Sequence, residues 1–485
     1  MAQADSTLDE GSRAGTRGSQ KSERSVLALM IAWAPAEPQR LGEIALFDAH
    51  GGTRIVGRGA PAEGNSERVV FYRQRPETLE TTAPLTSPGL SREQLRVRAI
   101  GDCLHVERIG KCLLEVAGRQ VERCTIAPGE SLLLKGQLLL YCTKRPRILP
   151  KSRNIVIVDG HGFGLPDAQG IVGESQVVWD LRDQLAWMAK VEQHTLLLGE
   201  SGSGKELCAR ALHAYSGRAN GPFIARNAAT IPPGIIDAEL FGNVKNYPNP
   251  GMTERPGLIG AAHQGTLFLD EIGELGPNLQ ANLLRVLDAG GEYHNLGGTL
   301  AKRSSFRLIG ATNRSADVLK HDLAARLVLR LEVPSLNERR EDIPFLVRHL
   351  LHRALATSPE AVNRFFSTTK DGQSEPNVRA KVIDVALKHT YTTNIRELEA
   401  MLWRAMAAST EDFIDWPFDA PRQNEPGDSA EEETMAAPAR EFTEEEIRTS
   451  LAEHKGNVTR AAKTLGLANR FALYRWMKKY GIEGE

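Results

Sequence analysis

The glycine-rich segment Gly199-Glu200-Ser201-Gly202-Ser203-Gly204-Lys205 has the residue types and spacing of a phosphate-binding loop. It follows an apolar run at 195–198 and precedes an apolar helical pattern from 207 to 215, which predicts a strand, a turn and a helix. Glycines let backbone N–H groups converge on a phosphate, and Lys205 can reach the β- and γ-phosphates. Glu206 occupies the position at which a Ser or Thr hydroxyl usually binds Mg²⁺. We predict a nucleotide site here; a glycine-rich surface turn is the alternative.

A second group of chemically capable residues ends the apolar run 265–269, where Asp270 and Glu271 follow directly. A carboxylate at the C-terminal end of a strand, facing the phosphate-binding loop, is suited to hold Mg²⁺. The neighbouring Glu271 is placed to polarise an attacking water as a general base. A solvated strand end is the alternative, and the loop 65 residues upstream makes the catalytic interpretation the preferred one.

Six segments in a fixed order resemble bacterial enhancer-binding proteins, the AAA+ ATPases that activate sigma-54 RNA polymerase. They are GESGSGKE, ELFG at 239–242, GTLFLDEIGEL at 265–275, ATNR at 311–314, ERREDIP at 338–344 and NIRELE at 394–399. The resemblance covers about 171–412 and implies a parallel α/β subdomain followed by a helical lid. That family also carries glutamate at the position of Glu206.

The resemblance implies a role for each matching residue in an ATP site with Mg²⁺. Lys205 would bind the phosphates, Asp270 would hold Mg²⁺ and Glu271 would activate water. Asn227 corresponds to the switch asparagine, which would hydrogen-bond Glu271 until the γ-phosphate is sensed. The remaining family positions are the sensor asparagine Asn313 and the lid's sensor arginine Arg396.

Two further positions imply a ring, most simply a hexamer. The family carries two arginines that act on a neighbouring subunit's nucleotide, and here they fall at Lys320 and Arg326. Lysine is a point charge without the planar guanidinium fork, so slower turnover than in relatives is expected.

The segment between 241 and 267 departs most from the family pattern. Where the family has the GAFTGA loop that touches sigma-54, this chain has Tyr247-Pro248-Asn249 within KNYPNPGM, with the loop length unchanged. Two prolines stiffen the segment, and Tyr247 offers an exposed aromatic side chain. Either the loop engages sigma-54 polymerase differently, or it binds another target or none.

The region 25–145 reads as short strands separated by turns, which predicts an all-β sandwich. Arg58 follows Gly57, and Ser91-Arg92 precedes a strand about 30 residues later, an arrangement that resembles a forkhead-associated (FHA) domain, in which these loops bind phosphothreonine. The family's histidine falls at Gln94, so a sandwich that only docks or dimerises is the alternative. The expected strands are Val26–Ala32, Glu43–Phe47, Arg54–Gly57, Arg68–Tyr72, Leu95–Ile100, Cys103–Arg108, Cys112–Val116 and Ser131–Tyr141.

The C-terminal segment predicts a DNA-binding helix-turn-helix. Thr443 and Glu446 form a capping-box pattern before a helix that runs to about 454. GNVTRAAKTLGL and LYRWMKKYGI resemble the Fis-type domain of the same activator family, and the charged residues between 454 and 480 are all basic. The residues expected to contact bases or phosphates are Asn469, Arg470 and Arg475.

The bulk composition fits a multidomain protein of 485 residues with 41% hydrophobic and 25% charged residues and a net charge of −1. Five cysteines without CxxC spacing and no long apolar run predict a cytoplasmic chain with no membrane partner. The expected organisation is 1–24 disordered, 25–145 FHA-like β-sandwich, 146–170 linker, 171–334 P-loop α/β subdomain, 335–412 helical lid, 413–440 acidic linker and 441–485 helix-turn-helix.

Two functions from different classes follow from this organisation. The first is an ATP-dependent transcription regulator that remodels sigma-54 polymerase under phosphothreonine control. The second is a DNA-bound, phosphopeptide-recognising scaffold or repressor whose ATPase serves as an assembly switch and does not engage sigma-54.

Overall fold

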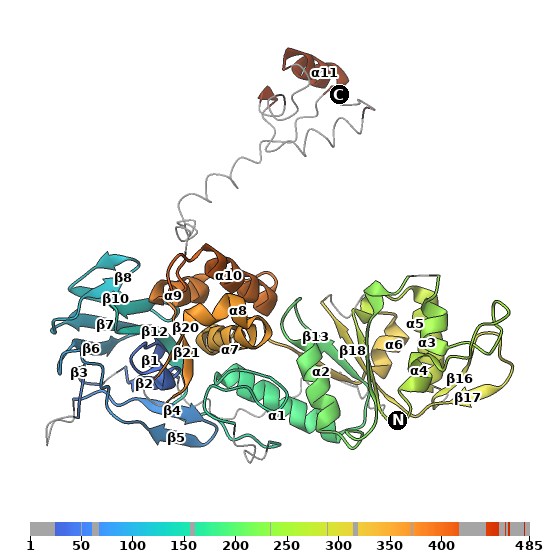
Figure 1. The fold of residues 1–485 in the computed structure, drawn as a ribbon, viewed down its shortest axis with the longest axis horizontal. Coiled ribbons are helices and arrows are strands. Elements are labelled where there is room, and N and C mark those ends of the chain that lie inside the picture. Colours follow the sequence, from blue (N-terminus) through green and yellow to red (C-terminus); the bar gives the residue numbers. More distant parts are fainter. Residues whose placement is uncertain are drawn as a thin grey trace, which may run out of the picture. The chain divides into compact units, whose positions relative to one another are not determined.

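The computed structural model describes residues 25–49, 51–60, 67–155, 161–232, 234–288, 290–313, 319–369, 372–416, 443–454, 461, 464–465 and 480. The chain divides into two compact units, Met1–Pro417 and Phe418–Glu485, and each is described by itself. Figure 1 shows three parts in the first unit: strands at its N-terminal end, a helix-covered sheet and a group of helices. Among the described residues, no helix is both long and apolar enough to span a bilayer.

The N-terminal part is a two-sheet β-sandwich, as predicted (Figure 1). One sheet has eight strands in the order β5-β4-β2-β1-β12-β11-β8-β9, and the other has four in the order β10-β7-β6-β3. Buried and exposed residues alternate strictly along β6, because successive side chains point to opposite faces of a sheet. The strands are β1 (Val26–Trp33), β2 (Ile44–Phe47), β3 (Arg54–Val56), β4 (Tyr72–Arg75), β5 (Thr78–Thr81), β6 (Leu95–Ile100), β7 (Cys103–Arg108), β8 (Leu114–Val116), β9 (Arg119–Gln120), β10 (Arg123–Ile126), β11 (Ser131–Leu134) and β12 (Leu138–Arg145), with a short 3₁₀ helix, η1, at Pro38–Arg40.

Two of the strand predictions are wrong in detail. The expected strand at 68–72 is replaced by the hairpin β4–β5, which turns at Glu77 with a φ of 59°. The expected single strand at 131–141 is the hairpin β11–β12, which turns through Gly136 at a φ of 71°. Leucines on both sides of that turn make the run look continuous in the sequence.

Strand β1 is buried on both faces, whereas a strand in a sheet with one solvent-facing side would be buried on one face only. Leu27, Leu29 and Ile31 pack into the core between the two sheets. Met30 and Ala32 point to the other side and belong to a second core that the sandwich shares with the helical lid. The eight-stranded sheet therefore lies between two apolar layers.

The α/β subdomain is built on a five-stranded parallel sheet of order β14-β15-β18-β13-β19. Apolar strands with helical crossovers predict this arrangement, and Figure 1 shows helices against the sheet. Its elements are α1 (Gln176–Lys190), β13 (Thr195–Leu198), α2 (Lys205–Ala214), β14 (Phe223–Asn227), η2 (Ala228–Thr230), α3 (Ile236–Phe241), α4 (Gly257–Ala261), β15 (Thr266–Asp270), η3 (Ile272–Glu274), α5 (Pro277–Asp288), β16 (Glu292–His294), β17 (Ala301–Arg303), β18 (Arg307–Thr312), α6 (His321–Arg326) and β19 (Leu329–Glu332).

The helical lid follows β19 and continues beyond its last helix. Ile414 is fully buried in the core of the lid and forms a β-bridge with Val378. Ordered contacts therefore extend to about residue 416, a few residues past the expected end at 412. The elements of the lid are η5 (Arg340–Asp342), α7 (Ile343–Thr357), α8 (Pro359–Val362), η6 (Asn363–Phe365), β20 (Phe366–Thr368), β21 (Ser374–Pro376), α9 (Ala380–Lys388) and α10 (Asn394–Ala408).

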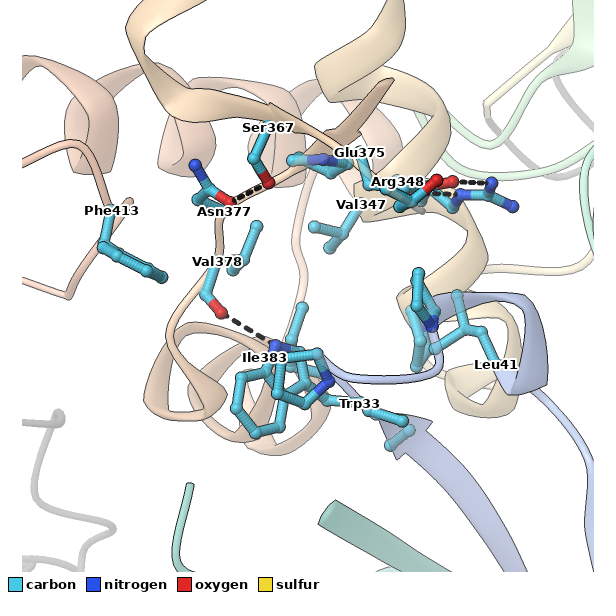
Figure 2. Close-up of a pocket in the computed structure, with 17 residues that line it drawn as sticks. Trp33, Leu41, Val347, Arg348, Ser367, Glu375, Asn377, Val378, Ile383 and Phe413 are labelled. Atoms are coloured by element: carbon cyan, nitrogen blue, oxygen red, sulfur yellow. Dashed lines mark hydrogen bonds and ion pairs between the residues drawn. The ribbon is translucent and has the colours of Figure 1, made fainter. Parts of the chain in front are cut away.

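The sandwich and the lid pack as closely as a protein interior. A side chain at Gly42 would meet the ring of Phe345 at 1.9 Å, so only glycine fits against that ring. Trp33 donates its indole N–H to the carbonyl of Val378 at 2.7 Å, beside a cavity of about 110 Å³ at this junction (Figure 2). The two parts therefore form one packed body within the first unit.

Charged contacts complete the junction. Arg145, with a side chain that is 3% exposed, pairs with Glu341 at 2.5 Å, and Thr143 donates to the same carboxylate. Arg75 pairs with Glu174, just before α1, at 2.7 Å. The sandwich thus contacts both the lid and the first segment of the α/β subdomain.

In the second unit, helix α11 (Glu444–Glu453) begins at a capping box. Thr443 accepts a hydrogen bond from the N–H of Glu446, and the Glu446 carboxylate accepts one from the N–H of Thr443. This confirms the predicted capping box at the start of the helix. The predicted DNA contacts Asn469, Arg470 and Arg475 lie outside the described residues.

Candidate functional site

The phosphate-binding loop lies between β13 and α2, as the sequence predicts. Gly202 and Gly204 adopt φ values of 74° and 107°, which glycine reaches without strain. Lys205 is 7% exposed, and its ammonium group donates to the carbonyls of Gly199 at 2.8 Å and Glu200 at 3.1 Å. The loop therefore holds its lysine inward by main-chain contacts.

Burial lowers the pKa of Lys205, and the nearby carboxylates of Asp270 and Glu271 oppose that effect. The described residues include no ion-pair partner for this lysine within 4.0 Å. A buried ammonium whose direct partners are carbonyls lacks an adjacent counter-charge, which a polyphosphate would supply. The residues present thus fit a nucleotide.

The parallel register brings the other predicted groups to the same edge of the sheet. Leu198, the residue before the loop, pairs with Thr312, and Asn227 pairs with Asp270. Carboxyl ends of parallel strands meet at one edge, so Asp270 lies beside the loop. A single carboxylate with phosphate oxygens is a common Mg²⁺ arrangement, and Asp270 is the residue suited to it.

Glu271 adopts a left-handed backbone conformation, with a φ of 51°, directly after β15. Its carboxylate accepts a hydrogen bond from the N–H of Asn313 at 3.4 Å, and its own N–H donates to Asp270 Oδ1 at 3.0 Å. A non-glycine residue at positive φ costs free energy and is typical of functional sites. The two carboxylates are therefore held in fixed relation.

Asn227 does not make the contact that the resemblance implies. The described hydrogen bonds do not join it to Glu271; instead its Oδ1 caps η2 by accepting from the N–H of Ala229 at 2.9 Å. Asparagine is a favoured N-cap residue, and this local bond competes with a longer reach to the carboxylate.

The lid reaches the phosphate-binding loop through the first turn of α10. Arg396 donates to the hydroxyl of Ser201 at 2.9 Å, so this predicted sensor residue does lie beside the loop. Glu206 is exposed and pairs with Arg210 one turn along α2 at 2.8 Å. The family position of Glu206 is therefore a surface ion pair in this structure.

Lys320 and Arg326 lie at opposite ends of α6, and both are exposed. Arg326 pairs with Asp288 at 2.6 Å, and the N–H of Lys320 donates to Gln280 at 2.8 Å. In the part of the chain that the structure describes, neither has a hydrogen bond or ion pair to the phosphate-binding loop.

The segment that stands in place of the expected sigma-54 loop is held together by hydrogen bonds from one asparagine at its start. The amide of Asn243 donates to the carbonyls of Val244, Tyr247 and Thr253, at 3.0 to 3.2 Å. Tyr247 is 41% exposed and packs one side of its ring against Gly297. The tyrosine is thus exposed, as predicted, and held at the base of a structured loop.

The two predicted phosphate-contacting loops of the sandwich lie side by side. The N–H of Arg58 donates to the carbonyl of Ser91 at 3.0 Å, and the Ser91 hydroxyl accepts from the N–H of Lys111 at 2.9 Å. Gln94 is fully buried, and its Oε1 accepts from the N–H groups of Ser91 and Cys112, so it joins the Ser91 loop to the chain at Cys112. Arg92 is exposed beside them.

Sequence reasoning missed Lys111, Asn394 and Arg339. The main-chain N–H of Lys111 donates to the Ser91 hydroxyl, and the Gly110-Lys111 turn was the only sequence signal for this residue. Asn394 and Arg339 donate to carbonyls of the phosphate-binding loop. Asn394 lies in the NIRELE segment and Arg339 in the ERREDIP segment, and both are more than 100 residues along the chain from the loop that they contact.

Three family comparisons match consecutive parts of the chain. Residues 171–337 match the Sigma-54 interaction domain, 337–434 match the AAA+ ATPase lid domain, and 439–480 match the Bacterial regulatory protein, Fis family. A solved structure of NtrX from Brucella abortus in complex with ATP is 30% identical, covers 64% of this chain and 69% of that chain, and superposes with a TM-score of 0.44.

Two curated relatives align with the same region. The DNA-binding transcriptional regulator NtrC of Rhizobium meliloti (strain 1021) is 37% identical over 272 residues, which span 55% of this chain and about half, 52%, of that protein. The regulatory protein AtoC of Escherichia coli (strain K12) is 34% identical over 328 residues, which span 64% of this chain and 68% of that protein. The chain therefore belongs to the family of sigma-54-dependent transcriptional regulators with a Fis-type DNA-binding domain.

Proposed function

We propose that this protein hydrolyses ATP to remodel promoter-bound sigma-54 RNA polymerase while its C-terminal domain binds DNA. The observation that carries the proposal is the meeting of Lys205, Asp270, Glu271 and Arg396 at one edge of the parallel sheet. Relatives whose names describe transcriptional regulators support the output.

Each residue has a separate role in ATP hydrolysis, set by its charge and its position. Lys205 neutralises the β- and γ-phosphates, and the glycine-rich loop presents its N–H groups to them. Glu271 accepts a proton from the attacking water. The bond from its N–H to Asp270 keeps it next to the residue that would hold Mg²⁺. Mg²⁺, held by Asp270, would neutralise charge on the phosphate oxygens. Arg396 would follow the γ-phosphate from the lid.

A ring is part of this proposal. Arg326 and Lys320 are exposed on α6 and are not bonded to their own chain's loop within the described contacts. A cation from a neighbouring subunit can stabilise the charge that develops on the transferred phosphoryl group. We assign Arg326 the larger share, because its guanidinium can bond two phosphate oxygens at once.

The target loop is assigned to Tyr247, Pro248 and Asn249. Asn243 fixes the base of the loop, and the tyrosine remains 41% exposed. An aromatic side chain on a stiff loop is suited to press on an apolar partner surface. The proposed partner is the sigma-54 polymerase that the matched domain is named for.

We also propose that the sandwich binds a phosphothreonine protein as an FHA-like domain. Main-chain N–H bonds bring Arg58 and Lys111 next to Ser91, and Arg92 follows it along the chain, so three cationic residues adjoin a hydroxyl, a combination that suits a dianionic phosphate. The buried Gln94, which stands where the family's histidine falls, joins the Ser91 loop to the chain at Cys112.

The second candidate function is a DNA-bound scaffold or repressor whose ATPase is an assembly switch. The observation in its favour is that Pro248 and Asn249 stand where the family's loop has other residues, and Lys320 stands where it has arginine. Promoter opening separates the two candidates, because only the first requires it.

Steady-state hydrolysis by the full-length protein tests the ATP site. We expect wild-type turnover, no nucleotide binding by Lys205→Ala, and retained binding with at least 100-fold slower hydrolysis by Glu271→Gln, because the general base is removed. Unchanged hydrolysis by Glu271→Gln would refute the assignment. Lys302→Ala, on the exposed strand β17, is the matched control for loss of a lysine.

A further inference from the structure

Three successive carbonyls of the phosphate-binding loop accept hydrogen bonds from the lid and the segment that leads to it. Asn394 Nδ2 donates to Ser201 O at 3.0 Å, and the N–H of Ile395 donates to Gly202 O at 3.2 Å. Arg339 Nη2 donates to Ser203 O, also at 3.2 Å. The loop is therefore held along its length by groups that lie outside the sheet.

Asn394 is the most constrained of these groups. It is fully buried and begins α10 with a φ of 51°, a conformation that non-glycine residues adopt at a cost. Its amide is used on both sides: Nδ2 also donates to Glu200 Oε2 at 2.9 Å, and Oδ1 accepts from the N–H of Leu336 at 2.6 Å. One side chain thus joins the loop, the lid and the linker between them.

The backbones are also in direct contact. A side chain at Gly202 would meet the carbonyl oxygen of Thr393 at 2.2 Å, so the loop and the start of α10 approach as closely as only glycine permits. The contact does not depend on the Asn394 side chain, and it shows that the two segments are packed together.

This arrangement has a consequence for the loop's N–H groups. In a trans peptide the carbonyl and the following N–H point in opposite directions. Carbonyls 201 to 203 are tied toward the lid, so the N–H groups of Gly202, Ser203 and Gly204 point to the other side of the loop. The Ser203 N–H makes a 3.3 Å turn contact with Glu200 O, within the loop itself.

We propose that Asn394 is a positioning residue that sets the phosphate-binding conformation of the loop and couples it to the lid. The proposal rests on the proposed function, because it assumes that the loop binds a nucleotide. Asn394 itself acts through the loop carbonyls and the Glu200 carboxylate. Nucleotide affinity then depends on where the first turn of α10 lies, which couples lid position to ATP binding.

Asn394→Asp in the full-length protein tests this directly. The substitution preserves shape and the acceptor for Leu336, but it places a carboxylate against Ser201 O and the carboxylate of Glu200. We expect the Kd for a fluorescent ATP analogue and the KM for ATP to rise at least tenfold, with a smaller change in kcat. Removing a hydrogen bond to a charged group has an effect of this size.

Asn337→Asp is the matched control. Asn337 also joins the linker to the lid, through Tyr391 and Arg340, and the described contacts do not connect it to the phosphate-binding loop. We expect both variants to have similar melting temperatures without nucleotide, and only Asn394→Asp to lose affinity. Equal affinities of the two variants would overturn the proposal.

Two further variants keep the proposal testable if Asn394→Asp folds poorly. Asn394→Gly removes the amide and adopts positive φ without strain, so the same loss of affinity is expected. Adding Glu200→Gln to Asn394→Asp restores a donor and acceptor pair with reversed polarity, and part of the affinity should return. No loss in Asn394→Gly would overturn the proposal, whereas a wild-type protein that binds no ATP would instead refute the proposed function.

Discussion

The guanidinium of Arg75, on β4 of the sandwich, forms a two-pronged ion pair with Glu174 at the entry to α1, with N–O distances of 2.7 and 3.2 Å. The Glu174 side chain is 1% exposed and also accepts from the N–H of Gly164 and the indole of Trp179. Since Phe345 of the lid packs on Gly42 of the sandwich, the sandwich holds the lid and the α/β subdomain together.

Arg75→Met is expected to lower the free energy of unfolding by about 3 kcal/mol, because it leaves the Glu174 carboxylate buried without its counter-ion. Urea unfolding followed by tryptophan fluorescence measures this, and Trp179 lies beside the Arg75 guanidinium. The control is Arg96→Met, whose ion pair with Glu107 is half exposed and should be worth under about 1 kcal/mol. Equal losses in both variants would contradict a bracing role for Arg75.

Stability should fall between pH 7.5 and pH 5 because of His194. Burial, together with the positive charge of Arg307, lowers the pKa of this histidine from 6.5 to about 4, and its Nδ1 accepts from the N–H of Leu308. The histidine therefore takes up a proton near pH 6.5 in the unfolded chain but only near pH 4 in the folded chain. This difference lowers the free energy of unfolding by about 2 kcal/mol at pH 5. The contribution of the neutral histidine to the free energy of unfolding is complete above pH 6.5 and decreases as the pH falls toward 4.

Denaturant titrations at both pH values measure this effect. His194→Asn keeps an acceptor for Leu308 and cannot titrate, so its stability should change less between pH 7.5 and pH 5 than that of the wild type. The same pH dependence in the variant would show that other groups are responsible.

Mixing two inactive variants tests whether Arg326 acts between subunits. Arg326→Ala lacks the cation, and Glu271→Gln lacks the base, so each alone should hydrolyse ATP at least 100-fold more slowly. In mixed rings, an intact Glu271 can face an intact Arg326, and the rate should return to on the order of a quarter of the wild-type rate. A mixture no faster than its components would place Arg326 in its own subunit, beside Asp288.

Arg58→Ala tests the phosphothreonine site. Titration of full-length protein into a labelled degenerate peptide library centred on phosphothreonine should show at least tenfold weaker binding, because a charge-assisted bond to phosphate is lost. Arg119→Ala, on the exposed strand β9, is the matched control. Equal binding of the phosphorylated and unphosphorylated libraries by the wild type would leave the sandwich a docking role alone.

The parts of the site that the sequence reveals are those in which neighbours along the chain do the chemistry. The strand, turn and helix around Lys205 and the strand that ends at Asp270 are local patterns, and both occur where predicted. The parallel register then brings them together, which follows from the fold class.

The parts that it does not reveal depend on contacts between distant segments. Asn394 reaches Ser201 over 193 residues, and Arg75 reaches Glu174 over 99, so neither pair has a local pattern. The turn at Gly136 is hidden by flanking leucines, and Asn227 Oδ1 makes a local cap on η2 where the resemblance implies a bond to Glu271. The shared core of sandwich and lid was equally invisible, because burial on both faces of β1 needs the lid in place.

This shared core decides which protein to use for the central test. A fragment limited to 171–412 would expose the lid surface that packs against Met30 and Tyr141, so the full-length chain is the appropriate material. The measurement is formation of open complexes on a promoter held closed by sigma-54 polymerase, with ATP turnover recorded in the same reaction. Our account predicts opening with the wild type and ATP, and none with Glu271→Gln. Hydrolysis by the wild type without opening would contradict it.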